Sequence, residues 1–584
     1  MSNMKKTTGP DIPRYSKAQE EEAIRAHAND HILPNLTFGE IVARKISSTL
    51  TPLEEYVYKK WYFDRILTIG DSCHKFEPIS GYGGNAALET AAVFVNELTK
   101  SLKESPSERL TTSQIQRILA RTQENRESRA KKLLKDAHSQ QRLEAMETPW
   151  DRIVAQYLLP RAPTSDVMYN MSRNVPSGQK LDMVSLPARP KWIPYDDELC
   201  KTPERRGKFA WFQVAVYLSA ALLAYYGMWI RSESYGVFDY LNQIVSTRSL
   251  SPATTAPLQT TYTGIGAIDE TLTLLNGIFV PGTGRFYKSY WMLQVYFLGS
   301  LVQPITVWCI ESCRIRNHLS LISFVSIWSV LYQLRGVGVL MPVWFASYTW
   351  KSESEHYWWP LSREVPLPYA KAILPAVLIG YVAPTILMFW PWESLSTVQA
   401  MTALWQPGPI AVQALVTVFA FLYRTARPSP RHQHRVADAE PQDLQYLRTA
   451  YSVAFVLGTV LHLSVVYILA TSSDPNLTFS AVFKPNWAAE RQTHGQGLRN
   501  LWLPDFYGLF VSTTFCCCAA VWDLNRVGLT SVSVYKASII LVVASIVVGP
   551  AAAMAGCWYW RELAMAVTAP KGSGNLRNRK EKTT

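Results

Sequence analysis

The sequence predicts a mainly α-helical, polytopic membrane protein with about eight transmembrane helices and a small soluble N-terminal segment. Two observations indicate this class. Charged residues are concentrated in residues 1–208, whereas residues 209–560 are rich in Leu, Val, Ala, Trp and Tyr. The apolar part contains runs of nearly 20 residues or more, and about 20 residues are needed to cross the hydrocarbon core of a bilayer. Most of the 20 Trp and 29 Tyr residues also lie there, and such rings suit the headgroup depth.

Composition divides the chain into four parts. Residues 1–160 are expected to form a soluble cytosolic segment, and residues 161–208 a Pro-rich linker. Residues 209–560 carry the membrane domain, and residues 561–584 form a basic polar tail. The chain is therefore expected to be an integral, multi-pass protein, with the endoplasmic reticulum as its predicted location. No signal peptide is visible at the N-terminus.

The soluble segment contains recognisable local elements. A short β-like run covers residues 65–69 and ends at Gly70. Apolar residues at helical spacing predict a helix over residues 86–102. A polar helix is predicted over residues 111–147, with Thr111 or Thr112 as its N-cap.

The apolar part is expected to contain eight membrane spans. They are placed near residues 209–230, 291–311, 319–347, 370–390, 407–423, 446–470, 502–522 and 536–559. The third span is interrupted by Gly336, Gly338 and Pro342. A further apolar run, residues 272–280, is too short to cross a bilayer and is interpreted as re-entrant.

The basic residues define the orientation only in part. Arg205, Arg206 and Lys208 place the N-terminal segment in the cytosol by the positive-inside rule. The basic stretch 424–435 also favours the cytosol, but the count of spans places it on the opposite side. We therefore expect one miscounted span or one re-entrant helix. A glycosylation sequon at residues 476–478 suits a lumenal loop.

The net charge of +13 does not indicate a nucleic-acid partner, because the basic residues are dispersed and no nucleic-acid motif accompanies them. Basic flanks of membrane helices instead predict contact with anionic membrane lipids. The eight cysteines have neither the spacing of a disulfide framework nor that of a metal site. No metal is therefore expected.

One motif carries chemistry. Residues 65–98 read RILTIGDSCHKFEPISGYGGNAALETAAVFVNEL, which resembles the second FAD-binding motif of aromatic-hydroxylase-type flavin monooxygenases. The matching residues are Gly70, Asp71, His74, Pro78, Gly81, Gly83 and Asn85. The resemblance implies that Asp71 accepts a hydrogen bond from a ribityl hydroxyl of FAD. It also implies that the glycine-rich turn and the helix behind it approach the cofactor, since helix N-termini favour negative charge.

Other parts of the flavoprotein pattern are not found. No GxGxxG fingerprint for the ADP half of FAD precedes Gly70. Thr90 stands where the family usually has an acidic residue after Glu89. The segment is therefore interpreted as a truncated, vestigial flavoprotein domain. No cofactor is expected, and FAD is suggested by the resemblance alone.

The layout of a flavoprotein-like segment followed by several spans resembles two groups of fungal meroterpenoid proteins. One comprises membrane-anchored FAD monooxygenases, and the other comprises membrane-bound terpene cyclases. We interpret the membrane part as a cyclase that protonates an epoxidised prenyl chain. Its partner would be a prenylated aromatic or farnesyl-type lipophilic substrate. The alternatives are a truncated FAD-dependent monooxygenase (an epoxidase) with a membrane anchor, and a non-enzymatic membrane protein such as a transporter.

A cyclase needs one acid in a poorly solvated site lined by aromatic rings, which stabilise cations. Carboxylates inside membrane spans are rare and are candidates for function. Asp505, flanked by aromatic residues, is the first candidate for the catalytic acid. Asp269 and Glu270 are the next, with helix capping as their alternative role. Glu311, close to Arg314, is interpreted as an interfacial ion pair.

Overall fold

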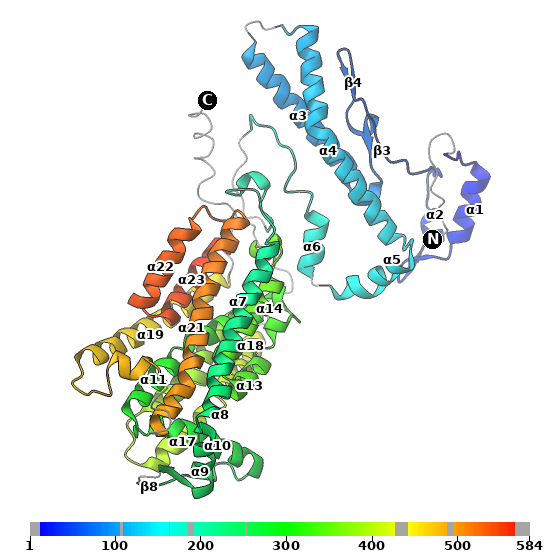
Figure 1. Cartoon of the computed structure of the whole chain (residues 1–584). Helices are drawn as coiled ribbons and strands as arrows, with labels where there is room; N and C mark the ends of the chain where they lie inside the picture. Colours follow the sequence, from blue (N-terminus) through cyan, green and yellow to red (C-terminus); the bar gives the residue numbers. More distant parts are fainter. Residues whose placement is uncertain are drawn as a thin grey trace. The chain divides into compact units, whose positions relative to one another are not determined.

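The computed structural model describes most of the chain and resolves two compact units, Met1–Pro187 and Ala188–Thr584 (Figure 1). The described residues are 12–105, 109–162, 164–184, 192–251, 254–426, 442–486 and 494–566. The boundary between the two units lies within the predicted linker. Most of the predicted basic tail lies outside the described residues.

The N-terminal unit contains short strands that pair only locally. All three of its described sheets are two-stranded and antiparallel. The pairs are β1 (His31–Leu33) with β2 (Leu36–Thr37), β3 (Tyr56–Val57) with β6 (His74–Lys75), and β4 (Tyr62–Phe63) with β5 (Ile66–Leu67). The short helices of this unit are α1 (Lys17–His27), α2 (Phe38–Val42), α5 (Pro149–Ile153), η4 (Val154–Leu158), η5 (Leu159–Arg161) and α6 (Thr164–Ser172).

Two long helices dominate this unit, α3 (Tyr82–Glu104) and α4 (Thr112–Glu144). They run antiparallel, because Glu89 pairs with Arg129 while Glu97 pairs with Arg121. Thr111 caps α4 through a reciprocal capping box with Gln114, which confirms the predicted start. The buried core between the helices and strands comprises Trp61, Cys73, Phe76, Ala86, Ala130, Leu133 and Ala137.

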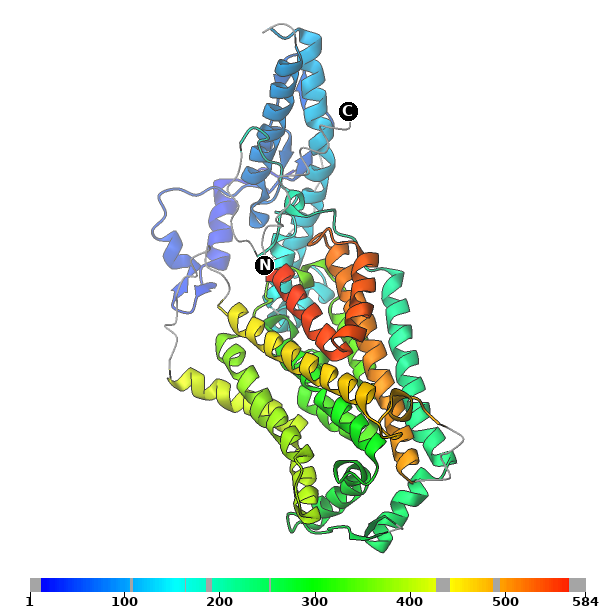
Figure 2. The ribbon, with the colours of Figure 1, turned by 90° about the vertical axis from the view of Figure 1, so that its left-hand side faces the viewer.

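The second unit is a bundle of helices whose long members lie side by side, among them α7, α14 and α21 (Figure 2). Its first half contains α7 (Lys208–Tyr225), η7 (Tyr226–Arg231), α8 (Ser232–Ser234), α9 (Val237–Thr247), β7 (Ser249–Ser251), β8 (Thr254–Pro257), α10 (Gly266–Thr283), α11 (Lys288–Gly299), α12 (Val302–Cys313), η8 (Ile315–Asn317), η9 (Leu321–Ser323), α13 (Val325–Arg335), α14 (Val337–Lys351) and η10 (Glu355–Trp358). Its second half contains α15 (Leu367–Val377), η11 (Leu378–Val382), α16 (Ala383–Phe389), α17 (Leu395–Trp405), α18 (Gly408–Ala426), α19 (Leu444–Thr471), α20 (Phe479–Phe483), α21 (His494–Arg526), α22 (Val534–Val547) and α23 (Pro550–Ala566).

Six helical stretches of the described residues are long and apolar enough to cross a membrane, rather than the eight predicted. They are Lys208–Ser234, Lys288–Cys313, Leu367–Phe389, Gly408–Ala426, Leu444–Thr471 and His494–Arg526. Each of the other two predicted spans is divided at a glycine with positive φ, a conformation that a continuous helix excludes. Gly336 (φ +97°) separates α13 from α14, and Gly549 (φ +95°) separates α22 from α23.

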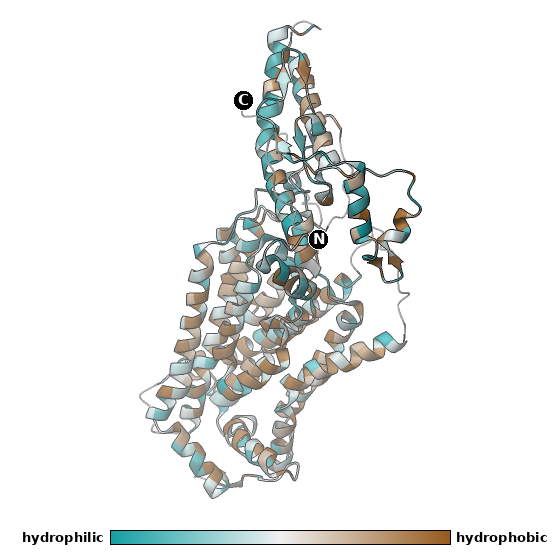
Figure 3. Cartoon of the chain, turned by 90° about the vertical axis from the view of Figure 1, so that its right-hand side faces the viewer, coloured by the Kyte–Doolittle hydropathy of each residue, from teal (hydrophilic) through white to brown (hydrophobic). Residues whose placement is uncertain are grey.

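The helices of this bundle are rich in hydrophobic residues (Figure 3), and many of these residues are exposed. Helix α22 has no buried residue, although it is composed mostly of Ile, Val and Ala. Tyr535, Ile539 and Ile546 on this helix are more than 60% exposed. In a water-soluble protein such an apolar surface would be unusual, because large exposed apolar patches generally mark a contact with lipid or protein.

Candidate functional site

The glycine-rich motif forms a chain of tight turns that ends at the start of α3. The turns are η2 (Gly70–Ser72) and η3 (Pro78–Ser80). Glu77 is buried and stabilises η3, because its carboxylate accepts the N–H groups of Ile79 (2.6 Å) and Ser80 (2.9 Å). Gly81 follows with φ +67° and stands at the N-cap of α3 without a side-chain cap. A residue with a side chain would be strained in that conformation.

The first turn of α3 borders open space. A Cβ added at Gly81 or Gly84 would meet no atom within 4 Å. At Gly83 the nearest atom would be Oδ1 of Asp71, at 3.9 Å. The exposed carboxylate of Asp71 therefore lies at the edge of the space in front of the helix. Its backbone is held by Tyr56, whose hydroxyl donates to the Asp71 carbonyl (2.7 Å).

Gly70 has a different role from the other glycines of the motif. Its φ of +61° and the close approach of α3 both require a residue without a side chain, since an added Cβ would lie 3.1 Å from Cβ of Ala87. Gly70 therefore allows the turn that carries Asp71 to pack on α3. It positions the site and does not line it.

His74 also serves the core. It is fully buried, its Nε2 lies 3.0 Å from Oγ1 of Thr90, and its ring packs edge-on against Trp61. Burial and the nearby Arg126 charge lower the pKa of His74, which favours the neutral ring. Thr90, at the position where the flavoprotein pattern has an acid, also accepts a hydrogen bond from Nε of Arg126 (3.3 Å).

Two arginines of α4 form ion pairs with Glu89 of α3. Nε and Nη2 of Arg129 donate to the two oxygens of Glu89 at 2.6 and 2.7 Å, and Arg126 pairs with the same carboxylate. Arg129 also donates to the carbonyl of Asn174 (2.8 Å). Burial raises the pKa of Glu89, but the hydrogen bond from Arg129 and the charge of Arg126 outweigh it, so the pKa lies below its usual value. This cluster was not predicted from the sequence, where its signal is the spacing of two arginines on one helix face.

Asp505, the first acid candidate, lies at the junction of two helices. Its Oδ1 accepts the N–H of Gly338 (2.5 Å) in the first turn of α14. A Cβ at Gly336 would lie 2.7 Å from the same oxygen, and one at Gly338 would overlap the Asp505 backbone. The carboxylate therefore caps α14 where the predicted third span is broken.

The other two acid candidates lie at the start of α10. Asp269 accepts hydrogen bonds from the N–H groups of Thr263 (2.7 Å), Tyr262 (3.1 Å) and Gly264 (3.0 Å). These bonds, that of Thr263 first, hold its pKa below the usual value. Glu270 is exposed. The three candidates thus do not share a polar contact within the part of the chain that the structure describes. The run predicted as re-entrant forms part of α10.

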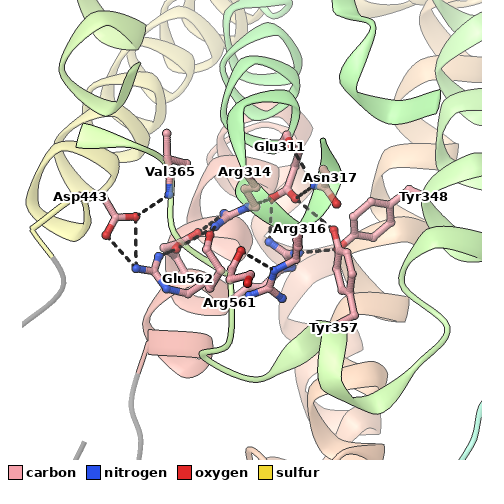
Figure 4. A network of polar contacts seen from close by, with 12 residues as sticks. Glu311, Arg314, Arg316, Asn317, Tyr348, Tyr357, Val365, Asp443, Arg561 and Glu562 are labelled. Carbon is pink, nitrogen blue, oxygen red and sulfur yellow. Dashed lines mark hydrogen bonds and ion pairs between the residues drawn. The ribbon is translucent and has the colours of Figure 1, made fainter. Parts of the chain in front are cut away.

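A buried ionic cluster joins the ends of several helices (Figure 4). Arg314 pairs with Glu311 at 3.0 Å, which confirms the predicted ion pair, and also with Glu562. Arg561 pairs with Glu311 at 2.9 Å. Arg363 pairs with Glu562 and, at 2.9 Å, with Asp443. We call these six residues the arginine cluster. It links the C-terminal ends of α12 and α23 to the first residue before α19.

The described residues contain no group of three or more His, Cys, Asp or Glu side chains placed to hold a metal ion. Cys557 packs against Cys517, with its Sγ 3.7 Å from the Cys517 carbonyl oxygen. The consecutive cysteines of α21 therefore serve helix packing in this part of the bundle.

Comparison with known proteins identifies the family of the helical unit. The CtvD domain family matches residues 213–566, which is more than half of the chain. The chain belongs to the CtvD domain family. A second family, described as FAD binding domain, matches residues 5–128 and covers the glycine-rich motif. No solved structure matches the chain significantly.

Several curated relatives align with nearly the whole chain. FAD-dependent monooxygenase verC1 of Penicillium polonicum is 25% identical over 95% of this chain and 68% of its own length. FAD-dependent monooxygenase BOA8 of Botryotinia fuckeliana is 23% identical over 97% of this chain and 66% of its own length. FAD-dependent monooxygenase asqG of Emericella nidulans is 35% identical over 35% of this chain and 36% of its own length. The chain spans about two thirds of the length of the relatives that it matches throughout.

These comparisons correct two interpretations. The terpene cyclase interpretation is wrong, because the relatives that share both parts of the chain are FAD-dependent monooxygenases. The expectation that no cofactor is needed is also wrong, because an FAD binding domain and these relatives indicate FAD. The layout of a soluble segment followed by apolar helices does not distinguish the two classes of enzyme, whereas the relatives that align with both parts do.

The residues present fit one half of FAD. The uncapped turn of α3, the open space at Gly83 and Gly84, and the Asp71 carboxylate suit a phosphate and a polyhydroxylated chain. All four sheets of the described residues are two-stranded and antiparallel, so this part of the chain has no parallel βαβ unit for the ADP half.

Proposed function

We propose that this chain acts as a membrane-held FAD-dependent monooxygenase on a lipophilic, unsaturated substrate. The substrate class is a prenylated aromatic or farnesyl-type chain, which gains one oxygen atom as an epoxide. The observation that carries the proposal is the open glycine turn at Gly81, Gly83 and Gly84, with the Asp71 carboxylate at its edge. This turn lies inside the segment that matches an FAD binding domain.

Each residue of the turn has a defined task in this proposal. Asp71 would accept a hydrogen bond from a ribityl hydroxyl, and the free N–H groups in the first turn of α3 would suit a phosphate. Gly83 lets the backbone approach the cofactor, because it has no side chain to fill the space. His74 and Glu89 hold the turn and the helix in place from the core. FAD, when bound, would supply the activation of O2 that monooxygenation requires.

The apolar helices are proposed to cross the membrane, with the arginine cluster at the cytosolic end. A second buried ion set supports this orientation, since Arg206 pairs with Asp523 at 2.7 Å and Arg526 pairs with Asp523 at 2.5 Å. Helix α14 connects both sets, because Tyr348 accepts from Arg561 and the carbonyl of Thr349 accepts from Arg206. Basic residues therefore gather at one end of the bundle, and that end faces the cytosol by the positive-inside rule.

The same arrangement bears on the conflict over the basic stretch 424–435, of which residues 427–435 lie outside the described residues. Gly380, late in the α15–η11 stretch, lies against Val412, early in α18, so the two helices run antiparallel. Helix α15 starts next to Val365, whose N–H donates to Asp443 of the arginine cluster. Helix α18 therefore ends at the same end of the bundle. Because the predicted third span is a pair of helices, α13 and α14, the chain returns to this end before α15.

The experiment is a turnover assay on membranes from a heterologous host that makes the chain. A prenylated arene is supplied with reduced nicotinamide and ¹⁸O2, and the products are analysed by mass spectrometry. The proposal predicts a product with one ¹⁸O atom that depends on the nicotinamide and is lost in Asp71→Ala. The exposed Glu124 on α4 provides a matched control, because Glu124→Ala should leave turnover intact. A product of unchanged mass, or oxygen incorporation that is indifferent to Asp71, would contradict the proposal.

A further inference from the structure

The end of the bundle opposite the arginine cluster carries an exposed acceptor sequence for N-linked glycosylation. Asn476 lies in the connection between α19 and α20, and its side chain is exposed. Thr478, two residues further on, caps α20, since its hydroxyl accepts the N–H of Ala481 (3.1 Å). The nearby ion pair between Lys288 and Asp474 (2.5 Å) is partly exposed, which is typical of an aqueous surface.

Helix α19 places this connection across the membrane from the arginine cluster. The residue before the helix, Asp443, belongs to that cluster. The helix has 28 residues, and at about 1.5 Å per residue it extends about 42 Å. The hydrocarbon core is about 30 Å thick. Helix α19 is therefore long enough to reach the far side of the hydrocarbon from the arginine cluster, and Asn476 follows its last residue, Thr471, in the chain.

We propose that Asn476 is N-glycosylated on the lumenal side of the membrane. The inference rests on the membrane orientation proposed above and does not depend on the flavin chemistry. The donor is a lipid-linked oligosaccharide pyrophosphate. A bond forms between Nδ2 of Asn476 and the anomeric carbon of the sugar, the bond from that carbon to the pyrophosphate oxygen breaks, and one Nδ2 proton is released. The lipid pyrophosphate is the leaving group.

The side chain is available for this reaction. Within the described residues, the side-chain amide of Asn476 makes one hydrogen bond, to Oδ1 of Asp474 at 3.2 Å, which is at the long end for such a bond. The hydroxyl residue of the acceptor sequence, Thr478, is ordered by its helix-capping bond. The acceptor and its hydroxyl thus lie on the same short connection, outside the helices.

Two further acceptor sequences act as internal controls. Asn35 and Asn170 begin Asn-Leu-Thr and Asn-Met-Ser sequences in the N-terminal unit, and both side chains are exposed. In the proposed orientation this unit is cytosolic, where no oligosaccharide is transferred. All three asparagines are exposed, and Asn35, like Asn476, lies outside the helices, so Asn35 is the closer control for the compartment. Asn170 lies within α6, and its side-chain amide donates to the Asp166 carbonyl (2.8 Å).

The test uses the full chain made in a eukaryotic host. Membranes are treated with an N-glycosidase in ¹⁸O water, which marks each former glycan site as a labelled aspartate, and the peptides are analysed by mass spectrometry. We expect one marked site, at Asn476, and a gel shift that is lost in Asn476→Gln but kept in Asn35→Gln and Asn170→Gln. Thr478→Ser preserves both the hydroxyl and the cap, so it should keep the glycan.

The outcomes separate the possible failures. A marked Asn35 or Asn170 would overturn both the glycan proposal and the membrane orientation. An unmarked chain would overturn the glycan proposal and leave the oxygen-transfer assay unaffected, because that assay depends on Asp71 and not on the lumenal loop.

Discussion

Replacing Glu89 by Gln tests whether the charge between α3 and α4 positions the glycine turn. In the native unit this carboxylate, whose side chain is 14% exposed, pairs with Arg129 and with the fully buried Arg126. The substitution leaves the Arg126 charge buried and unpaired. Removing one partner of a buried ion pair costs about 3–5 kcal/mol. We expect Glu89→Gln to destabilise the packing of α3 on α4 by about 3 kcal/mol, at the low end of this range, because water reaches part of the Glu89 side chain.

Hydrogen exchange of the full chain in detergent micelles measures this effect locally. Each 1.4 kcal/mol changes an equilibrium about tenfold, so the amides of α3 and α4 should exchange more than about 100-fold faster in Glu89→Gln. The matched control is Glu127→Gln on α4, where an exposed pair with Lys131 is worth about 0.3–0.5 kcal/mol. If the amides of α3 and α4 exchange at the same rate in Glu89→Gln and Glu127→Gln, the charge of Glu89 does not hold the two helices together.

The same contact has a defined pH dependence. The folded-state pKa of Glu89 lies below its ordinary value of 4.5. Its contribution to stability is therefore fully present above about pH 4.5, and it is lost as the pH falls through the folded-state pKa. Protection of α3 and α4 in the native chain should decrease in acid over that window. In Glu89→Gln, the protection of α3 and α4 should not show this decrease in acid.

Three further substitutions test other parts of the structure. Gly83→Leu should leave the fold intact, since an added Cβ at this position meets only Asp71 Oδ1, at 3.9 Å. The leucine side chain should occupy the open space, so FAD binding should weaken at least tenfold in a fluorescence titration. Glu562→Gln should lower the free energy of unfolding of the detergent-solubilised chain, because the buried Arg314 and Arg363 each lose one of two carboxylate partners and keep only Glu311 and Asp443 respectively. The exposed Glu270→Gln should leave it unchanged. Asp505→Ala should cost about 1 kcal/mol through loss of the α14 cap, which hydrogen exchange at the start of that helix detects.

Local features of the fold could be predicted from the sequence. The cap at Thr111 and the turn around Gly81 depend on neighbouring residues, and the pattern of each is complete within a few positions. The long apolar helices follow from composition in the same way. The break at Gly336 could not be placed as a chain reversal, because it depends on Asp505, which lies 167 residues from Gly338 in sequence.

Long-range contacts account for most of what the sequence analysis missed. Arg314 and Glu562 are 248 residues apart, and no local pattern indicates that they meet in the arginine cluster. The motif predicts a flavin site with Asp71 as the acceptor of a ribityl hydroxyl, but it does not give the role of His74. His74 matches the flavoprotein pattern, and only its burial against Trp61 and Thr90 shows that it serves the core.

The function was misjudged for a related reason. An aspartate inside an apolar run matches both a catalytic acid and a helix cap, and Asp505 has the geometry of the cap. Only one FAD-binding motif is recognisable in the sequence, so the apolar helices dominate its pattern. The relatives that align with nearly the whole chain are FAD-dependent monooxygenases, in which the two parts occur together.

A binding titration shows whether the turn before α3 holds FAD. The full chain in detergent micelles is titrated with FAD, and flavin fluorescence and retention of the flavin after desalting are recorded. We expect the native chain to bind FAD saturably. Asp71→Ala should weaken this binding at least tenfold, and Glu124→Ala should leave it unchanged. Binding of equal strength in all three proteins, or no saturable binding by the native chain, would contradict it.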